Sequence, residues 1–181
     1  MRIGLQKTAG ALRGTARLSL VAAACAALIA ACAGTVPRRA EPADKGWVPR
    51  EILDTPPYAA FRTGYDTATI VHDFVPLIRS AKEGVDVIVF FGGWCPDSRQ
   101  EVPHFLRLAD EAGIPSSRIR LYALDRTKKS DDGQTAQYGI ERVPTFIFLK
   151  GGKELGRITE FPSTTIEADV LTILAKGMQR P

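Results

Sequence analysis

The chain has 181 residues, of which 45 % are hydrophobic, and it carries 24 basic and 20 acidic residues, a formal net charge of +4. This length fits one domain, and the hydrophobic fraction is enough for a packed core, so neither a disordered chain nor a multidomain assembly is indicated. Four of the basic residues and none of the acidic ones lie in the first 31 positions, which leaves 20 of each sign in the remainder. No basic stripe with interleaved aromatic residues is present, and we expect no nucleic-acid partner.

The first 31 residues have the pattern of a secretory leader. A basic segment precedes an apolar run of small residues over 18–31, which is too short and too rich in alanine for a good membrane span. The run ends in Ile29-Ala30-Ala31-Cys32, which resembles a bacterial lipobox. We therefore expect residues 1–31 to be a signal peptide of the lipoprotein type and Cys32 to carry a lipid anchor on the periplasmic side of the bacterial cell envelope. An ordinary signal peptide with an incidental cysteine is the alternative.

The following segment, 32–57, is rich in proline, alanine and charge and shows no sustained period. We interpret it as a tether between the leader and a folded domain that spans 58–181. Trp47 and Val48 within it are compatible with packing against the domain or with disorder throughout the tether.

A helix and a strand are predicted before the central motif. Thr67 is suited to cap a helix whose apolar positions between Ile70 and Ile78 share one face, with Pro76 bending or shortening it. The apolar run from Val85 to Phe91 then predicts a buried strand.

The central motif places a thiol between that strand and a helix. The strand ends at Gly92-Gly93, and a helical pattern begins just past Cys95 and reaches about Ala112, followed by Gly113 as a C-cap. At a helix N-terminus, unpaired backbone amides and the helix dipole favour the thiolate over the thiol. The two other cysteines, Cys25 and Cys32, lie in the leader and the lipobox, so Cys95 is a lone thiol, which in an exported domain indicates intermolecular chemistry.

The remaining segments complete a recognisable order of elements. The predicted elements are a strand over 119–124, a charged loop over 125–134, a short helix over 135–140, strands over 146–150 and 153–161 joined by a glycine turn, and a helix over 164–176. Solvated surface is the plain interpretation of the charged loop, and partner binding is the alternative. The order βαβ, hairpin and helix predicts an α/β fold, a mixed sheet of four to five strands with helices on both faces.

Two motifs resemble those of the thioredoxin superfamily. Trp94-Cys95-Pro96-Asp97-Ser98 is similar to its active-site motif, with serine in place of the second cysteine, and the extension Arg99-Gln100-Glu101-Val102-Pro103 looks like the exported, TlpA-like branch. Tyr138 to Phe146 resembles the second signature, in which a proline, here Pro144, follows a cis peptide bond beside the cysteine. The resemblance runs from about Phe61 to the C-terminus and implies a thioredoxin-like fold.

The resemblance also implies roles for individual residues. Cys95 would be the nucleophile, and Ser98 would donate a hydrogen bond to its thiolate. The residues implied to line the substrate groove are Trp94, Pro96, Val143, Pro144 and Thr145. Many relatives carry a buried acid six positions before the first cysteine, where this chain has Val89.

Serine at position 98 leaves only part of the dithiol chemistry. Cys95 can attack a disulfide and form a mixed disulfide, but a further thiol must release the product. We therefore expect an exported monothiol thiol–disulfide oxidoreductase, monomeric, with reduced or absent dithiol reductase activity, acting on disulfides or thiols of cell-envelope proteins. The alternative is a non-catalytic thioredoxin-fold module that binds or captures a protein. We expect no cofactor and no metal, because neither His72 nor His104 lies at metal-ligand spacing from Cys95.

Overall fold

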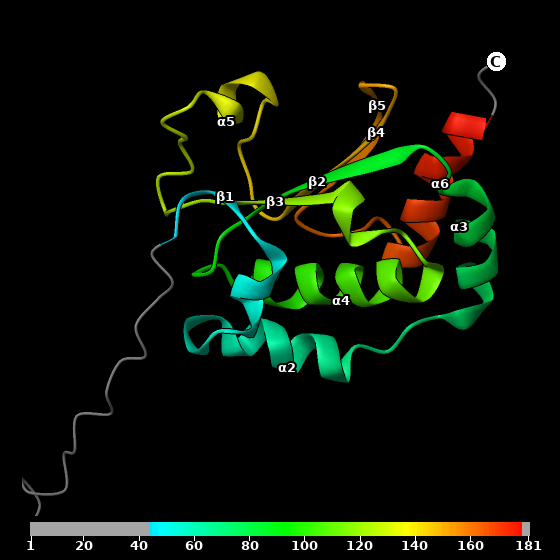
Figure 1. Cartoon of the computed structure of the whole chain (residues 1–181), viewed down its shortest axis with the longest axis horizontal. Coiled ribbons are helices and arrows are strands. Elements are labelled where there is room, and N and C mark those ends of the chain that lie inside the picture. Colours follow the sequence, from blue (N-terminus) through cyan, green and yellow to red (C-terminus); the bar gives the residue numbers. More distant parts are fainter. Residues whose placement is uncertain (1–43, 179–181) are drawn as a thin grey trace, which may run out of the picture. The chain divides into compact units, whose positions relative to one another are not determined.

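Five strands form one mixed sheet in the computed structural model, which describes residues 44–178 (Figure 1). The strands are β1 (Gly46–Val48), β2 (Val85–Phe91), β3 (Ile119–Ala123), β4 (Thr145–Lys150) and β5 (Lys153–Thr159). Their order in the sheet is β1-β3-β2-β4-β5; β2 runs parallel to β3, and the other neighbours are antiparallel. The predicted α/β fold with a mixed sheet is confirmed.

The central strand β2 is apolar on both faces because both faces are covered. Val87 and Val89 point into one cluster of buried side chains, and Ile88 and Phe90 point into another. All four are fully buried. A strand in this position is a nearly continuous hydrophobic run, which is why its bounds were predicted from the sequence.

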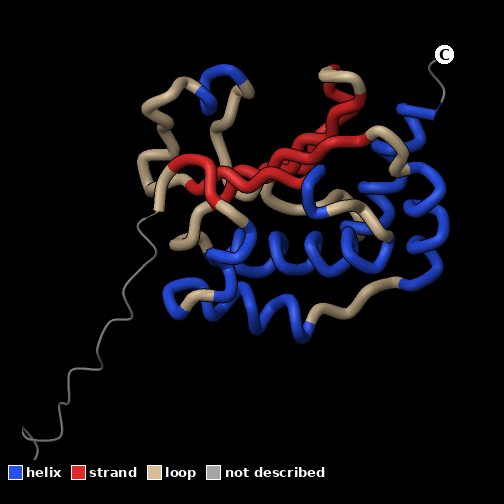
Figure 2. The backbone as a smooth tube through the Cα atoms, in the orientation of Figure 1, coloured by secondary structure: helices blue, strands red, loops and turns tan. Residues whose placement is uncertain are grey.

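Helices cover the two faces of the sheet unequally. The helices are α2 (Ala59–Thr67), α3 (Val75–Ala81), α4 (Pro96–Ala112), α5 (Gln134–Gln137) and α6 (Ile166–Met178), with short 3₁₀ turns at Arg50–Asp54, Pro56–Tyr58, His72–Phe74 and Ser116–Arg118. Side chains from α2, α3, α4 and α6 share one buried cluster with the Val87 side of β2, which we call the helical face. The single turn of α5 lies on the other side of the sheet (Figures 1 and 2).

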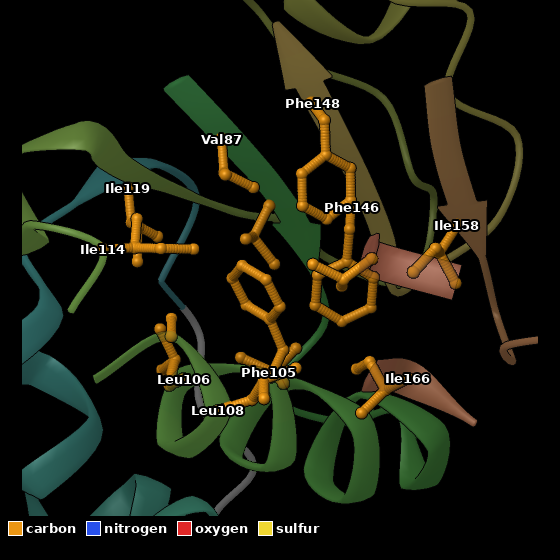
Figure 3. Packing of buried hydrophobic residues seen from close by; sticks show 14 of the residues in the cluster. Val87, Phe105, Leu106, Leu108, Ile114, Ile119, Phe146, Phe148, Ile158 and Ile166 are labelled. Atoms are coloured by element: carbon orange, nitrogen blue, oxygen red, sulfur yellow. The ribbon is translucent and has the colours of Figure 1, made fainter. Parts of the chain in front are cut away.

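Aromatic residues link α4 to the sheet on the helical face. The Phe105 ring centroid lies 5.1 Å from that of Phe146 and 5.9 Å from that of Phe148. Figure 3 shows Phe105 rising from α4 toward these two residues of β4. All three side chains are fully buried, so this contact holds the longest helix against the middle of the sheet.

The ends of α4 follow from its sequence. Pro96 occupies the first turn, where a missing amide proton costs nothing, and Gly113 ends the helix with a left-handed φ of 72°. Pro103 lies inside the helix and faces α2 at Gly64, where a Cβ atom would lie only 2.7 Å from the Pro103 Cγ. The two helices therefore approach more closely than a larger residue at position 64 allows.

The helix predicted from Thr67 is wrong. Thr67 is the last residue of α2, and the apolar positions after it are divided among an extended segment, a 3₁₀ turn and α3. Pro76 lies in the first turn of α3, where proline fits, rather than bending a longer helix.

The tether is shorter than the sequence indicated. Residues 46–48 form β1, whose Gly46 pairs with Ala123 and whose Val48 pairs with Leu121. Trp47 packs edge-on against Tyr122, with ring centroids 5.0 Å apart. Of the two alternatives for this segment, packing is observed, and the folded part of the chain begins no later than Gly46.

The leader, Cys32 and the first part of the tether lie outside the described residues. Within 44–178, no helix combines the length and the apolar character needed to cross a membrane.

Candidate active site

Cys95 lies where the central strand passes into the longest helix. Its backbone amide donates to the Gly92 carbonyl at 2.9 Å, and its own carbonyl accepts from the Arg99 amide at 3.1 Å. With φ −82° and ψ 125°, Cys95 is the N-cap of α4. The thiol therefore sits at a helix N-terminus as predicted, and 5 % of the residue is exposed. It is the free cysteine of the described part of the chain.

The second sequence motif meets Cys95 in space. The Cys95 thiol donates to the Val143 carbonyl, with 3.4 Å between Sγ and O. The Val143–Pro144 peptide bond is cis, as the resemblance implied. Thr145 is buried and its hydroxyl donates to the Arg142 carbonyl at 2.8 Å, which closes the turn around Val143. Two segments that lie 48 positions apart thus form one site.

Ser98 does not contact the sulfur by a hydrogen bond. The fully buried hydroxyl oxygen accepts from the Gly92 amide at 3.2 Å, and no hydrogen bond joins Ser98 to Cys95 within the part of the chain that the structure describes. The Gly92 amide lies at the end of β2, where it needs an acceptor, and Ser98 supplies one. In this arrangement Ser98 fastens the first turn of α4 to the strand instead of stabilising a thiolate.

Trp94 is held beside Cys95 by three contacts. Its indole Nε1 donates to the Leu124 carbonyl at 2.8 Å, and the Arg126 guanidinium lies over its ring, 5.0 Å from the centroid. Below the ring is Gly92, where a Cβ atom would lie 2.7 Å from Trp94 Cε2. The sequence identified Gly92 only as a residue that ends the strand, and no local pattern signals this close approach.

The first turn of α4 is exposed on one side and fixed on the other. Pro96 is exposed next to the thiol. The Arg99 side chain donates through Nε to the Gly93 carbonyl at 2.8 Å, which holds the turn that carries Cys95. Pro96 is therefore the accessible neighbour of the sulfur, and Arg99 stiffens the backbone beneath it.

An ion pair that sequence reasoning missed braces the Val143 segment. Arg142 Nη1 lies 2.6 Å from Glu160 Oε2, and the Glu160 amide donates to the Pro144 carbonyl at 2.7 Å. Glu160 has φ 61°, an uncommon conformation for a residue other than glycine. Next to it is Phe161, which is 55 % exposed. The contacts on both sides of Val143 hold its carbonyl opposite the thiol.

The buried carboxylates of the domain belong to the helical face rather than to the thiol. Val89 at the position of the family's buried acid is fully buried. Glu167 Oε1 accepts from the Val71 amide at 3.1 Å and lies 3.3 Å from His104 Nε2. Burial raises the pKa of Glu101, which is also on α4. Among residues 44–178, no three side chains of the kinds that bind metals lie close enough to hold an ion.

The chain is similar in sequence to thioredoxins and to a protein disulfide-isomerase. A family model described as thioredoxin matches residues 58–172. Thioredoxin-2 of Saccharomyces cerevisiae is 35 % identical over 72 residues, which cover 40 % of this chain and 64 % of the yeast protein. The protein disulfide-isomerase of Oryctolagus cuniculus is 33 % identical over 66 residues, 36 % of this chain but only 13 % of that protein.

A viral protein and a solved thioredoxin structure are also similar to this chain. A thioredoxin-like protein of Acanthamoeba polyphaga mimivirus is 25 % identical over 101 residues, 56 % of this chain and 71 % of the viral protein. The X-ray structure of Fasciola hepatica thioredoxin has 30 % identity over 49 % of this chain and 79 % of that one, with a TM-score of 0.33. With the family match covering well over half of its length, the chain belongs to the thioredoxin family and is related to thiol–disulfide oxidoreductases.

Proposed function

We propose that this protein is an exported thiol–disulfide oxidoreductase of the monothiol type, with Cys95 as its nucleophile. The observation that carries the proposal is the placement of the Cys95 sulfur at the N-cap of α4, 3.4 Å from the Val143 carbonyl. Both halves of this arrangement serve disulfide exchange, since the first turn of α4 presents the sulfur and the Val143 segment offers backbone groups to a substrate.

The reaction begins with loss of the thiol proton to solvent. The Cys95 thiolate attacks one sulfur of a substrate disulfide, so that a bond between Cys95 and that sulfur forms as the substrate S–S bond breaks. The second substrate sulfur leaves as a thiolate and takes up a proton. A thiol of the substrate or of another molecule then attacks the mixed disulfide, forms a new S–S bond with the substrate sulfur and returns the Cys95 thiolate. Ser98 holds the backbone in this scheme and takes no part in electron transfer.

Deprotonation of Cys95 also prepares the groove for its substrate. In the resting site the thiol donates to the Val143 carbonyl. A thiolate has no proton to donate, so the carbonyl then needs another donor. An extended substrate segment supplies one through its backbone amide, as in strand addition to a sheet edge. Activation of the nucleophile and binding of the substrate are therefore coupled through one carbonyl group.

The decisive experiment traps the covalent intermediate in cells. Mixed disulfides between this protein and envelope proteins should form in the wild type and disappear in Cys95→Ser, as seen on non-reducing gels after acid quenching and alkylation. Ser98→Cys should turn the site into a conventional dithiol with much higher insulin-reductase activity. Substrate turnover that persists in Cys95→Ser would refute the proposal.

Export and anchoring are supported by the leader pattern and the lipobox at Cys32. Labelled fatty acid should be incorporated into the mature protein, and Cys32→Ser should release it from the membrane fraction, since acyl chains provide about 0.8 kcal/mol per buried methylene. A wild-type protein that carries no fatty acid, or a variant whose membrane association is unchanged, would contradict the anchor while leaving the redox chemistry of Cys95 intact.

A binding module without turnover is the second candidate. It is favoured by the burial of Cys95, of which only 5 % is exposed, and by the engagement of Ser98 with Gly92. In this case the groove captures an extended polypeptide, and the sulfur contributes packing. Partner binding that survives Cys95→Ala, together with no exchange of a model disulfide by the wild type, is the result that selects this function.

A further inference from the structure

The acidic residues of the segment 125–133 are paired with other groups of the chain. Asp125 accepts from the Thr127 amide at 2.8 Å, and Asp131 lies 2.9 Å from the Lys45 ammonium, which also lies 3.6 Å from Asp125. The third acid, Asp132, accepts from the Tyr122 hydroxyl at 2.7 Å. These partners hold the carboxylates against the edge of the sheet near β1 and β3.

The basic residues of the same segment lie toward the active site. Arg126 stacks on the ring of Trp94, the neighbour of the nucleophile. Lys128 and Lys129 line a hollow of about 580 Å³ together with the hydroxyl residues Thr127, Ser130 and Thr135. We call Arg126, Lys128 and Lys129 the basic rim.

Two residues that line the hollow directly precede the Val143 segment in the sequence. The lining includes Ile140 and Glu141, which directly precede the Arg142-Val143 step opposite the sulfur. Ile140 belongs both to this lining and to the buried cluster that contains Cys95 and Val143. The lining contains two lysines and one acid, Glu141. Its net positive charge favours binding of a carboxylate.

We propose that the basic rim selects substrates that carry acidic residues close to their reactive cysteine. This inference rests on the proposed function, because it assigns the substrate class of the same site. The rim acts at short range: the mature chain has as many acidic as basic residues and supplies little long-range attraction. The acids of the loop are tied to Lys45, Thr127 and Tyr122, while Lys128 and Lys129 line the hollow that shares Ile140 with the cluster around Cys95.

The test uses three short peptides of equal length whose single cysteine is joined to a chromogenic aromatic thiol. Glutamates flank the cysteine in the first, glutamines in the second and lysines in the third. Attack by Cys95 releases the coloured thiol and gives a second-order rate constant. We expect the acidic peptide to react about tenfold faster than the basic one at low salt, a preference that 0.5 M salt removes.

Paired variants assign that preference to the rim. In the double variant Lys128→Gln, Lys129→Gln the rate ratio should fall to about one, while the glutamine peptide keeps its rate. The matched control removes two exposed lysines elsewhere, Lys153→Gln with Lys176→Gln, and should leave the ratio unchanged. Equal rates for all three peptides in the wild type, or a preference that persists in the rim variant, would overturn the inference while the redox function of Cys95 stands.

A binding measurement distinguishes failure of the proposed Cys95 reaction from failure of the basic rim. If no peptide reacts, the proposed function fails, and the rim is then tested by fluorescence anisotropy of a labelled acidic peptide with Cys95→Ser. Tighter binding by Cys95→Ser than by the same chain with both rim lysines replaced supports the rim as a recognition surface. Equal affinities for the two chains overturn it.

Discussion

The two faces of the sheet divide stability and chemistry between them. On the helical face, α2, α3, α4 and α6 enclose one large cluster of buried residues. On the opposite face, a smaller cluster around Phe90 includes Cys95 and Val143, and α5, which lies on this side of the sheet, contributes no buried residue to it. Under the proposed function a polypeptide approaches Cys95 from this thinly covered face, which we call the reactive face, and the bulk of the core lies on the other side.

Cys95 joins the two faces. Its backbone caps α4, which packs on the helical face, and its side chain belongs to the cluster on the other face. The helix is held by its aromatic contacts with β4, and this fixes the position of its N-terminus. The position of the thiol is therefore set by packing on the helical face, opposite the cluster that holds its side chain.

The largest expected effect tests whether stability is concentrated on the helical face. Phe105→Ala should lower the free energy of unfolding by about 3–5 kcal/mol, because it leaves a cavity between α4 and the aromatic residues of β4. Ile140→Ala on the reactive face should cost about 2 kcal/mol, since Ile140 is 8 % exposed and lies under thin cover. Urea unfolding followed by circular dichroism gives both values. Equal losses for the two variants would remove the distinction between the faces.

A smaller effect is expected where α2 approaches α4. Gly64→Ala places a methyl group 2.7 Å from the Pro103 Cγ and 3.1 Å from the Arg99 carbonyl, and neither the ring nor the backbone yields easily. We expect a loss of about 1–3 kcal/mol, in spite of the better helix propensity of alanine. The matched control is Gly177→Ala in α6, whose nearest neighbour is the movable end of Leu155. A Gly64→Ala protein as stable as the wild type would show that the close approach is unimportant.

The smallest expected effect is on the stability of the fold at low pH, through Glu167. Burial by itself would raise the pKa of Glu167, but hydrogen bonds from backbone amides, including that of Val71, and the nearby His104 bring it below its ordinary value. A carboxyl whose pKa is lower in the folded state stabilises the fold above its unfolded pKa, and this contribution disappears as the pH falls through the folded value. Glu167→Gln should therefore lose less stability than the wild type between about pH 6 and pH 3.

The urea midpoints of the two proteins at these pH values measure the difference. Glu83→Gln, an exposed carboxylate in the turn before β2, is the control and should follow the wild type closely. If Glu167→Gln retains the full acid dependence, the buried carboxylate on the helical face does not carry it.

Local patterns were sufficient for the elements next to the thiol. The apolar run, interrupted only by Asp86, predicted the bounds of β2, and Gly113 marked the end of α4 because its left-handed φ suits glycine. The cis bond before Pro144 came from the resemblance, since the residues themselves favour a trans bond. These features depend on neighbours in sequence or on a shared motif, and they could be predicted.

Features that depend on partners distant in sequence could not be predicted. The three residues of β1 have no periodicity and become a strand only because β3 offers an edge. Thr67 has the chemistry of an N-cap, yet tertiary packing of Phe61 places the helix before it. In the site, Ser98 was expected to face the sulfur and instead satisfies the Gly92 amide, a requirement that is visible only once strand and helix are positioned. The Arg142–Glu160 pair has no signal in either local sequence.

The ion pairs of Lys45 have a mechanical consequence. This residue immediately precedes β1, and its ammonium group grips the loop that also carries the cation stacked on Trp94. A displacement of the chain at Lys45 therefore shifts both the edge strand β1 and the loop that lies against Trp94, beside Cys95.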